Sequence, residues 1–89
     1  MLFMKNMQLH ISHNVQEKIL HKHGIGISEL KEALKHGKPK VIKLKGNIYM
    51  AITHYLRYIT MIFEYNKPIA DVITAYTSSE QQIRRYNKK

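Results

Sequence analysis

Hydrophobic and polar side chains alternate in two stretches in the middle of the chain. From Ile48 to Tyr55 and from Arg57 to Tyr65, Ile, Met or Phe recurs at every second position, with mostly Tyr, Thr or Ala between. This period of two in β-branched and aromatic residues is typical of strands. A third run from Ile69 to Thr77 follows a turn at Pro68. The links are too short for a parallel return, so three antiparallel neighbours are predicted.

A fourth strand is predicted just before these three. It covers Lys40 to Lys45, after Pro39 and before a Gly-Asn turn. Alternation puts Ile42 and Leu44 on one side and Lys43 and Lys45 on the other. Gln8 to Ser12 is a weaker candidate for a short extra strand at the start of the chain.

Two helices are predicted before the sheet, with apolar residues at helical spacing. The first begins at Ser12 or Asn14, because either can accept a hydrogen bond from a first-turn N–H, and ends at Gly24 in a left-handed conformation. The second begins at Ser28 as N-cap and ends at Gly37. Their apolar positions are Val15, Ile19 and Leu20, and then Ile27, Leu30, Ala33 and Leu34.

A last helix is predicted from about Ser79 to Asn87. Two pairs fit a capping box at its start, Thr77 with Glu80 and Ser78 with Gln81, and the pattern does not choose between them. The order of elements predicts a single α+β domain over residues 1–89, with an ordered core from about 9 to 87. An antiparallel four-stranded sheet is covered by the two-helix hairpin.

The two faces of the sheet are predicted from the alternation. The Ile, Met and Phe side is expected to pack on the hairpin, and the other side to carry tyrosines and lysines. The expected core residues of the sheet are Ile52, Ile59, Met61, Phe63 and Ile73, packed on Ile19, Leu30 and Leu34. The expected polar-side residues are Tyr49, Tyr55, Tyr58, Lys43 and Lys45.

Charge adds a candidate partner. The chain has 15 Lys and Arg against 6 Asp and Glu, a net charge of +9. Residues 35–45 and 81–89 contain no acid, and this clustering favours a polyanion such as nucleic acid over an acidic protein or anionic lipid. An ordinary solvated basic surface is the alternative. The absence of Cys, of a signal-peptide run and of a membrane-length apolar run predicts a cytoplasmic protein without thiol chemistry.

Four short motifs resemble the BrnT type of toxin, a branch of the RelE/ParE-like superfamily. Their order and spacing over roughly residues 9–87 carry the resemblance. They are Lys22-His23-Gly24-Ile25, Ile27-Ser28-Glu29-Leu30, Tyr55-Leu56-Arg57-Tyr58, and Val72-Ile73-Thr74-Ala75 followed by Glu80 and Arg84-Arg85-Tyr86. The chain differs from the family at Tyr76, where the family has arginine.

The resemblance implies a RelE/ParE-like fold and a small ribonuclease toxin. Its partners would be RNA and a DNA-binding antitoxin, of the ribbon-helix-helix type, encoded beside it. A homodimer and a hetero-oligomer both stay open. The alternative is a non-catalytic basic module that binds RNA, DNA or an acidic protein, and the difference at Tyr76 motivates it.

RNA can be cut without a metal or cofactor when its 2′-OH attacks the adjacent phosphate. The reaction needs a base, an acid and a cation on the phosphorane. Arg57 is the leading cation, because a guanidinium suits phosphate; its structural alternative is an ion pair with Asp71 or Glu64. His23 is the first candidate base and His54 the second.

Two further candidates have structural explanations of equal weight. Glu80 is a catalytic carboxylate or a helix cap. Tyr86 stacks on a base or donates a hydrogen bond, or else packs the last helix on the sheet.

RNA is predicted to bind along a surface where Lys and Arg contact the phosphates and tyrosine rings stack on the bases. Its predicted members are Lys43, Lys45, Tyr55, Tyr58, Arg84 and Arg85. No metal or cofactor is expected, because neither His10 with His13 nor His21 with His23 has the spacing of a helical zinc pair.

Overall fold

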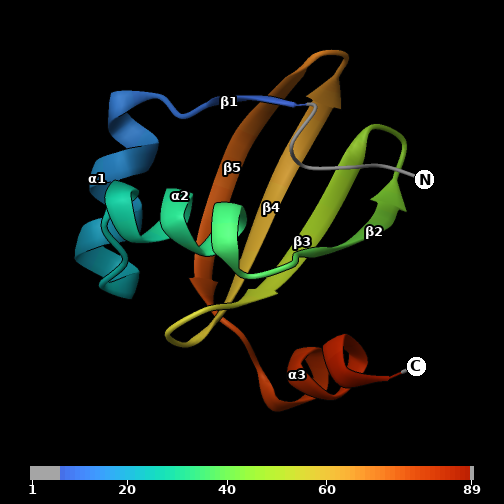
Figure 1. Ribbon diagram of the computed structural model, residues 1–89. Helices are drawn as coiled ribbons and strands as arrows, with labels where there is room; N and C mark the ends of the chain where they lie inside the picture. Colours follow the sequence, from blue (N-terminus) through green and yellow to red (C-terminus); the bar gives the residue numbers. More distant parts are fainter. Residues whose placement is uncertain (1–6, 89) are drawn as a thin grey trace.

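Five strands form one sheet in the order β1-β5-β4-β3-β2, as the computed structural model of residues 7–88 shows (Figure 1). The elements among these residues are β1 (Gln8–His10), α1 (His13–His23), α2 (Ile27–His36), β2 (Lys40–Lys45), β3 (Ile48–His54), β4 (Tyr58–Asn66), β5 (Ile69–Thr77) and α3 (Glu80–Asn87). The predicted α+β class and the order of elements are confirmed.

β1 confirms the weak candidate for an extra strand. It pairs in parallel with β5, with Gln8 opposite Ile69, and so occupies one edge of the sheet. β2 to β5 form the predicted antiparallel meander. No helix in the described part of the chain is long and apolar enough to cross a membrane. Residues 1–6, on which part of the cytoplasmic prediction depends, lie outside the described residues.

The face assignment of β3 was wrong. The register sets Ala51 opposite Met61 and Tyr49 opposite Phe63, and directly paired residues share a face. Tyr49 therefore lies on the hairpin side, where its ring stacks on Phe63 with centroids 5.7 Å apart. The residues Ile48, Met50 and Ile52 lie on the opposite face. The alternation within each strand was predicted correctly. The loop from 55 to 57, however, decides which residues of β3 share a face with which residues of β4.

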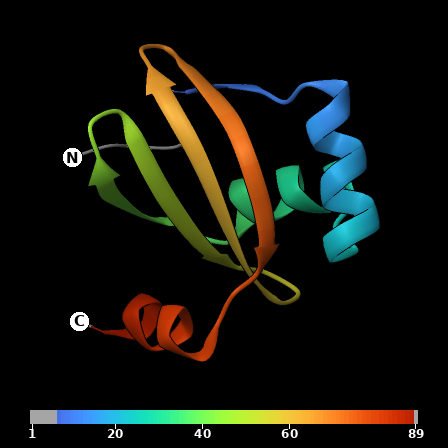
Figure 2. The same cartoon turned by 180° about the vertical axis from the view of Figure 1, so that it is seen from behind.

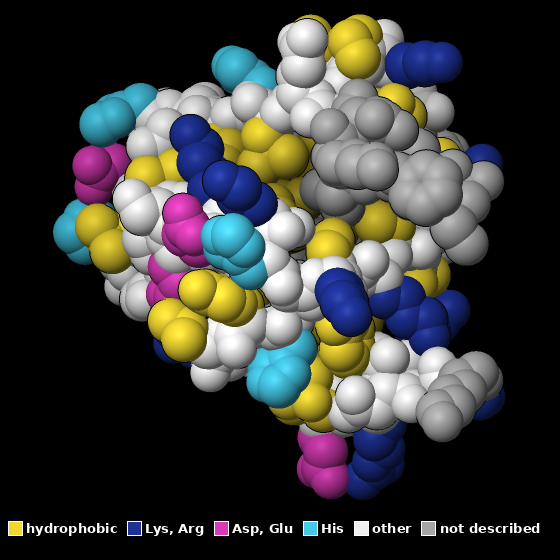
Figure 3. Space-filling view, viewed as in Figure 1, with side chains coloured by type: hydrophobic (Ala, Val, Ile, Leu, Met, Phe, Trp, Pro, Cys, Tyr) yellow, Lys and Arg dark blue, Asp and Glu magenta, His cyan; other side chains and the backbone are white. Residues whose placement is uncertain are grey.

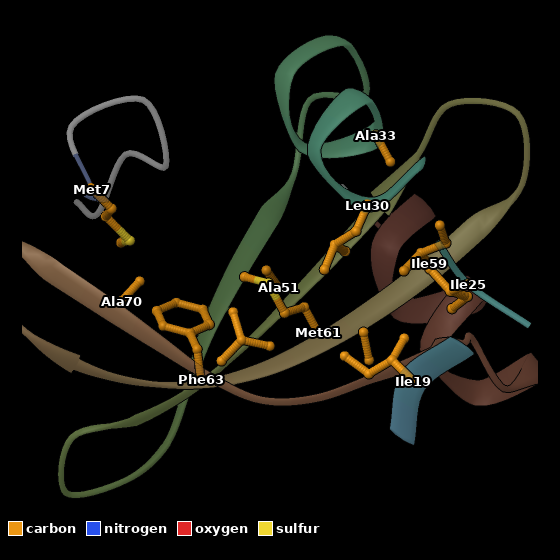
Figure 4. Close-up of a cluster of buried hydrophobic side chains, with 12 residues drawn as sticks. Met7, Ile19, Ile25, Leu30, Ala33, Ala51, Ile59, Met61, Phe63 and Ala70 are labelled. Carbon is orange, nitrogen blue, oxygen red and sulfur yellow. The ribbon is translucent and has the colours of Figure 1, made fainter. Parts of the chain in front are cut away.

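The main core lies between the sheet and the α1–α2 hairpin (Figure 4). Phe63, Met61 and Ile59 of β4 are buried in it, as predicted, together with Ile19 and Leu30 of the helices. Two predicted core residues differ. Ile52 is fully buried but belongs to the other face, and Ile73 is 44% exposed because a bulge between Ile62 and Phe63 shifts the β4–β5 register. Leu34 is only partly buried.

Helix starts were predicted less well than helix ends. Ser12, rather than Asn14, caps α1 by accepting from the N–H of Val15. Gly26 precedes α2 in an extended conformation without a side-chain cap, so Ser28 lies inside the first turn. Gly24 ends α1 with φ of 65°, as predicted.

The capping box of α3 is Ser79 with Gln82, so both predicted boxes were wrong. β5 stays paired with β4 through Thr77, and the N–H of Ser78 donates to the carbonyl of Tyr58. The backbone is therefore engaged in sheet pairing up to Ser78, and the helix starts only after it.

α3 lies across the end of the sheet near the β3–β4 loop (Figure 2). The Gln82 side chain carries much of this contact: its Oε1 accepts from Thr60 Oγ1 at 3.0 Å, and its Nε2 donates to Tyr76 Oη at 3.0 Å. At the other end, Lys40 Nζ donates to the carbonyls of Arg85 and Lys88. These polar contacts hold the start of α3 on β4 and β5 and its end on β2.

Candidate functional site

Arg57 lies at the end of the β3–β4 loop and points to the corner between α1 and α2. Its Nε and Nη2 donate to the two carboxylate oxygens of Glu29, at 2.7 and 2.8 Å, and Nη2 also donates to the carbonyl of Gly24 at 2.9 Å. The partner is therefore Glu29, and the predicted alternatives were wrong. Of these, Asp71 instead contacts His10 at 3.0 Å.

The Glu29 pair fixes both the charge and the orientation of Arg57. The hydrogen bonds that Arg57 donates to Glu29 raise the pKa of the guanidinium more than partial burial lowers it, so the group is a permanent cation. Nη1 has no hydrogen-bond partner among residues 7–88, and 41% of the side chain is exposed. Its two N–H groups are thus oriented and free to donate to an anion such as phosphate.

His23 lies at the same corner, as the last residue of α1 before Gly24. Its ring is half-buried and lies 6.0 Å from the ring of Tyr76. Tyr76 stands where the resembled family has arginine, and its Oη accepts the hydrogen bond from Gln82. The corner therefore brings together two predicted site residues, Arg57 and His23, with Glu29, which the sequence analysis named only as part of a short motif.

A second group of predicted residues forms an aromatic cluster. The rings of His54 and Tyr58 stack with centroids 3.9 Å apart and planes 5° from parallel. Tyr86 meets Tyr58 edge-on at 5.8 Å. Tyr55 projects from the β3–β4 loop with 44% of its surface exposed, beside the ring of His36.

Tyr86 anchors the end of α3. Its hydroxyl lies 3.0 Å from the carbonyl oxygens of both Gly37 and Lys38, to which it donates. Burial raises the pKa of Tyr86, and the neighbouring Tyr58 raises it further. These contacts favour the structural alternative, in which Tyr86 packs the last helix.

Tyr86→Phe is expected to lower stability at neutral pH and to change its alkaline dependence. A phenol with a raised pKa in the folded state contributes stability below the unfolded pKa of about 10, and loses it as pH rises through the folded value. The stability difference between wild type and Tyr86→Phe should therefore be constant up to about pH 10 and decrease above it. Urea unfolding across this range measures it. A difference that is independent of pH contradicts the anchoring role.

Glu80 is not a helix cap. It is the first residue of α3 and pairs with Arg84 at 2.7 Å, with both side chains largely exposed. The contact is an i,i+4 ion pair on the helix surface, of the kind that contributes little to stability.

The C-terminal cations line a hollow against β2. Arg84 and Arg85 form it with Lys40, Ile42 and Lys88, and it has a volume of about 470 Å³; we call these five residues the basic groove. Lysine and arginine side chains are visible over β2, α3 and the hairpin, and most of the acidic ones visible on this face lie beside those of the hairpin (Figure 3). Helices α1 and α2 carry four lysines and three glutamates, while residues 38–58 carry five cations and no acid.

Lys43 and Lys45 do not belong to this groove. Lys43 pairs with Tyr49 on the hairpin side, whereas Lys45 pairs with Ile48 on the opposite side, because a bulge separates them. The expectation that they share one face was therefore wrong, and their RNA-binding role stays a prediction. Lys40 and Lys88 take the places beside Arg84 and Arg85, and the run of lysines in 35–45 was the signal for Lys40.

Metal ligands do not gather in the described part of the chain. No three side chains of His, Cys, Asp or Glu among residues 7–88 lie close enough together to hold an ion. The six histidines pair instead with single acids or rings, such as His21 with Glu17 at 2.9 Å and His54 with Tyr58.

Comparison with known proteins supports the fold. No protein-family model matches the sequence, and no curated protein matches it. Among solved structures, the BrnT ribonuclease toxin of Brucella abortus is similar, with a TM-score of 0.66 and 23% sequence identity. The similarity covers 83% of this chain and 99% of that one. The chain thus has the fold of a BrnT toxin, as the sequence resemblance implied.

Proposed function

We propose that this protein is a ribonuclease toxin that cuts RNA without a metal or cofactor. The observation that carries the proposal is the likeness of its fold to the BrnT ribonuclease toxin over almost the full length of that chain. The oriented cation of Arg57 and the excess of positive charge support it, because both suit an RNA phosphate.

The proposed reaction is attack of a 2′-OH on the adjacent phosphorus. A base takes the hydroxyl proton as the O2′–P bond forms, and an acid protonates the leaving 5′ oxygen as the P–O5′ bond breaks. Arg57 would donate from Nη1 to the oxygens of the phosphorane, where negative charge develops. Glu29 would act as a positioning residue that keeps this donor aimed.

His23 is the favoured proton carrier, because it lies on the same helix corner as Arg57. His54 is the second, although its ring is stacked on Tyr58. Glu80 and Tyr86 are less suited, since the first is paired with Arg84 and the second donates to two carbonyls. The exposed ring of Tyr55 offers a surface on which an unpaired base can stack.

The proposal includes a partner and a location. A toxin of this kind would act in the cytoplasm and be held by an antitoxin, of the ribbon-helix-helix type, encoded beside it. A short gene for such a repressor next to this one would support the proposal independently of any activity measurement.

Arg57→Ala tests the proposal. We expect wild type to cleave single-stranded RNA in EDTA and Arg57→Ala to be slower by about 100-fold or more, because removing one donor to a developing anion costs that much. Arg57→Lys keeps the charge but loses the planar guanidinium that donates parallel hydrogen bonds, so its cleavage rate is expected to lie between those of wild type and Arg57→Ala. Cleavage is followed by gel electrophoresis of a labelled RNA.

Lys31→Ala on the exposed side of α2 is the matched control, because it also removes one cation and should cleave at the wild-type rate. Circular dichroism of each variant shows whether it is folded. If the folded wild-type protein binds RNA and does not cleave it, the ribonuclease proposal is contradicted and the non-catalytic module is supported.

A further inference from the structure

A chain of hydrogen bonds at the start of α3 ends at the hydroxyl of Tyr76. Within it, Gln82 Oε1 accepts from the backbone N–H of Ser79 at 2.9 Å. Because a backbone N–H can only donate, this contact identifies the oxygen of the Gln82 amide, and Nε2 is the atom that lies 3.0 Å from Tyr76 Oη. An amide nitrogen only donates, so the Tyr76 oxygen accepts, and the hydrogen of Tyr76 is not used in this contact.

The hydroxyls on the other side of Gln82 are oriented in the same direction. Thr60 Oγ1 lies 3.0 Å from Gln82 Oε1 and donates to it, because a carbonyl oxygen only accepts. The single hydrogen of Thr60 is then used, so Ser78 Oγ, at 2.7 Å, donates to Thr60. Each hydrogen bond in such a chain polarises the next donor. The chain therefore ends in a polarised O–H at Tyr76, and no group among residues 7–88 accepts its hydrogen.

Tyr76 lies beside the corner that holds Arg57 and His23. Its half-buried ring is 6.0 Å from the ring of His23. Arg57 donates to the carbonyl of Gly24, the residue that follows His23. Two donors that have no partner in the described part of the chain, Arg57 Nη1 and the Tyr76 hydroxyl, are therefore found next to the favoured base.

We infer that Tyr76 is the general acid of the proposed cleavage, and that its hydroxyl protonates the leaving 5′ oxygen. The inference rests on the proposed function, which needs an acid as well as a base. His23 takes the proton of the 2′-OH as the O2′–P bond forms, and Tyr76 gives its proton to O5′ as the P–O5′ bond breaks. The N–H of Gln82 stabilises the resulting tyrosinate, because a hydrogen bond donated to the charged form favours that form. Water then carries the proton from His23 to Tyr76 and restores both groups.

The alternative is a structural role, in which Tyr76 only anchors α3 through Gln82 and its hydrogen faces water. The two roles differ in how cleavage depends on the leaving group. If Tyr76 protonates the leaving oxygen, its hydroxyl is needed only when the leaving group takes up a proton. If Tyr76 only anchors the helix, its loss slows the cleavage of every substrate by the same factor.

Tyr76→Phe is therefore assayed in EDTA with two labelled RNAs, one with an ordinary scissile linkage and one in which sulfur replaces the scissile 5′ oxygen. A thiol ionises near pH 8.5, as that of cysteine does at about this value, so a thiolate leaves without taking up a proton. We expect Tyr76→Phe to cut the ordinary RNA more slowly than wild type by about 100-fold or more, because acid catalysis contributes that much. The loss should be in kcat rather than in KM. The sulfur-substituted RNA should be cut at the wild-type rate.

Gln82→Glu tests the orientation of the Tyr76 hydroxyl. The substitution keeps the capping box with Ser79, but it puts a carboxylate oxygen where Nε2 now faces Tyr76. That oxygen accepts the Tyr76 hydrogen, so we expect slow cleavage of the ordinary RNA and recovery with the sulfur-substituted RNA. Gln81→Glu adds the same charge at an exposed position of α3 and is the matched control, which should cut both RNAs at nearly the wild-type rate.

Tyr65→Phe is the control for the loss of a hydroxyl, because Tyr65 packs on the main core and should not affect cleavage. If wild type cuts neither RNA, the proposed function and this inference both fail. If wild type cuts the ordinary RNA, and Tyr76→Phe is as fast or is slowed by the same factor on both RNAs, the inference alone is overturned. Circular dichroism shows whether each variant is folded, and if Tyr76→Phe is not, the same comparison with Gln82→Glu decides.

Discussion

Phe63→Ala is expected to lower the free energy of unfolding by about 3–5 kcal/mol. The Phe63 side chain is fully buried in the core cluster and stacks on Tyr49, so its loss leaves a cavity that the sheet cannot close. A chain of this length has a total stability of roughly 4–13 kcal/mol. The variant is therefore expected to be partly unfolded near physiological temperature, which urea denaturation monitored by circular dichroism measures.

Ile73→Ala is the control for this prediction. Ile73 is an apolar residue in the neighbouring strand but is 44% exposed, so its truncation should cost less than about 1 kcal/mol. Equal losses for the two variants would contradict the register between β4 and β5, because that register separates the buried residue from the exposed one.

Gly37→Ala is expected to destabilise the domain by about 3 kcal/mol, although it adds a single methyl group. An added Cβ would collide with Thr53 Oγ1 and the carbonyl of Ala33, and would lie 2.9 Å from the carbonyl of His54. The Thr53 hydroxyl donates to the same Ala33 carbonyl at 2.8 Å, so the methyl group displaces a buried hydrogen bond. Thermal unfolding measures the loss.

Gly26→Ala is the matched control. Gly26 also lies next to α2, has an ordinary φ of −78°, and has open space where a Cβ would be. Its substitution should change stability by less than about 1 kcal/mol, because the lower entropy of the unfolded chain offsets a slightly poorer N-cap. If both variants are equally stable, backbone adjustment relieves the collision at Gly37, and the predicted cost is wrong.

The sequence was sufficient to predict which segments are strands and helices, because periodicity is a local property. The period of two in β3 and β4 and the apolar stripes of α1 and α2 correspond to elements in the structure. The relation between strands is not local. His54 pairs with Tyr58, and this turn geometry places Ile52 on the face of α3 and Ala51 on the face of the hairpin. Either alternating set of β3 residues could share a face with Ile59, Met61 and Phe63 of β4, so the pattern alone could not show which set faces the hairpin.

The candidate site was predictable to a smaller extent, for a related reason. Arg57 stood out because it is a lone cation at the start of an apolar strand, but its partner Glu29 is 28 positions away, and no pattern connects them. Lys43 and Lys45 were assigned to one face by simple alternation, which the bulge between them interrupts. Ion pairs across the fold and irregularities in a ladder depend on tertiary contacts, which residue spacing does not report.

The uneven distribution of charge gives the folded molecule an electric dipole moment. The hairpin is close to neutral, since the four lysines of α1 and α2 are nearly balanced by Glu17, Glu29 and Glu32, whereas β2 and residues 84–88 together carry six cations and no acid. In the field of a large anion, such a molecule turns before it touches, and the β2 and α3 side arrives first. Encounters that begin with the hairpin become rare at low ionic strength. Added salt shortens the range of this orienting effect to about 8 Å at physiological ionic strength, so the rate of productive encounter falls even where the final contacts are unchanged.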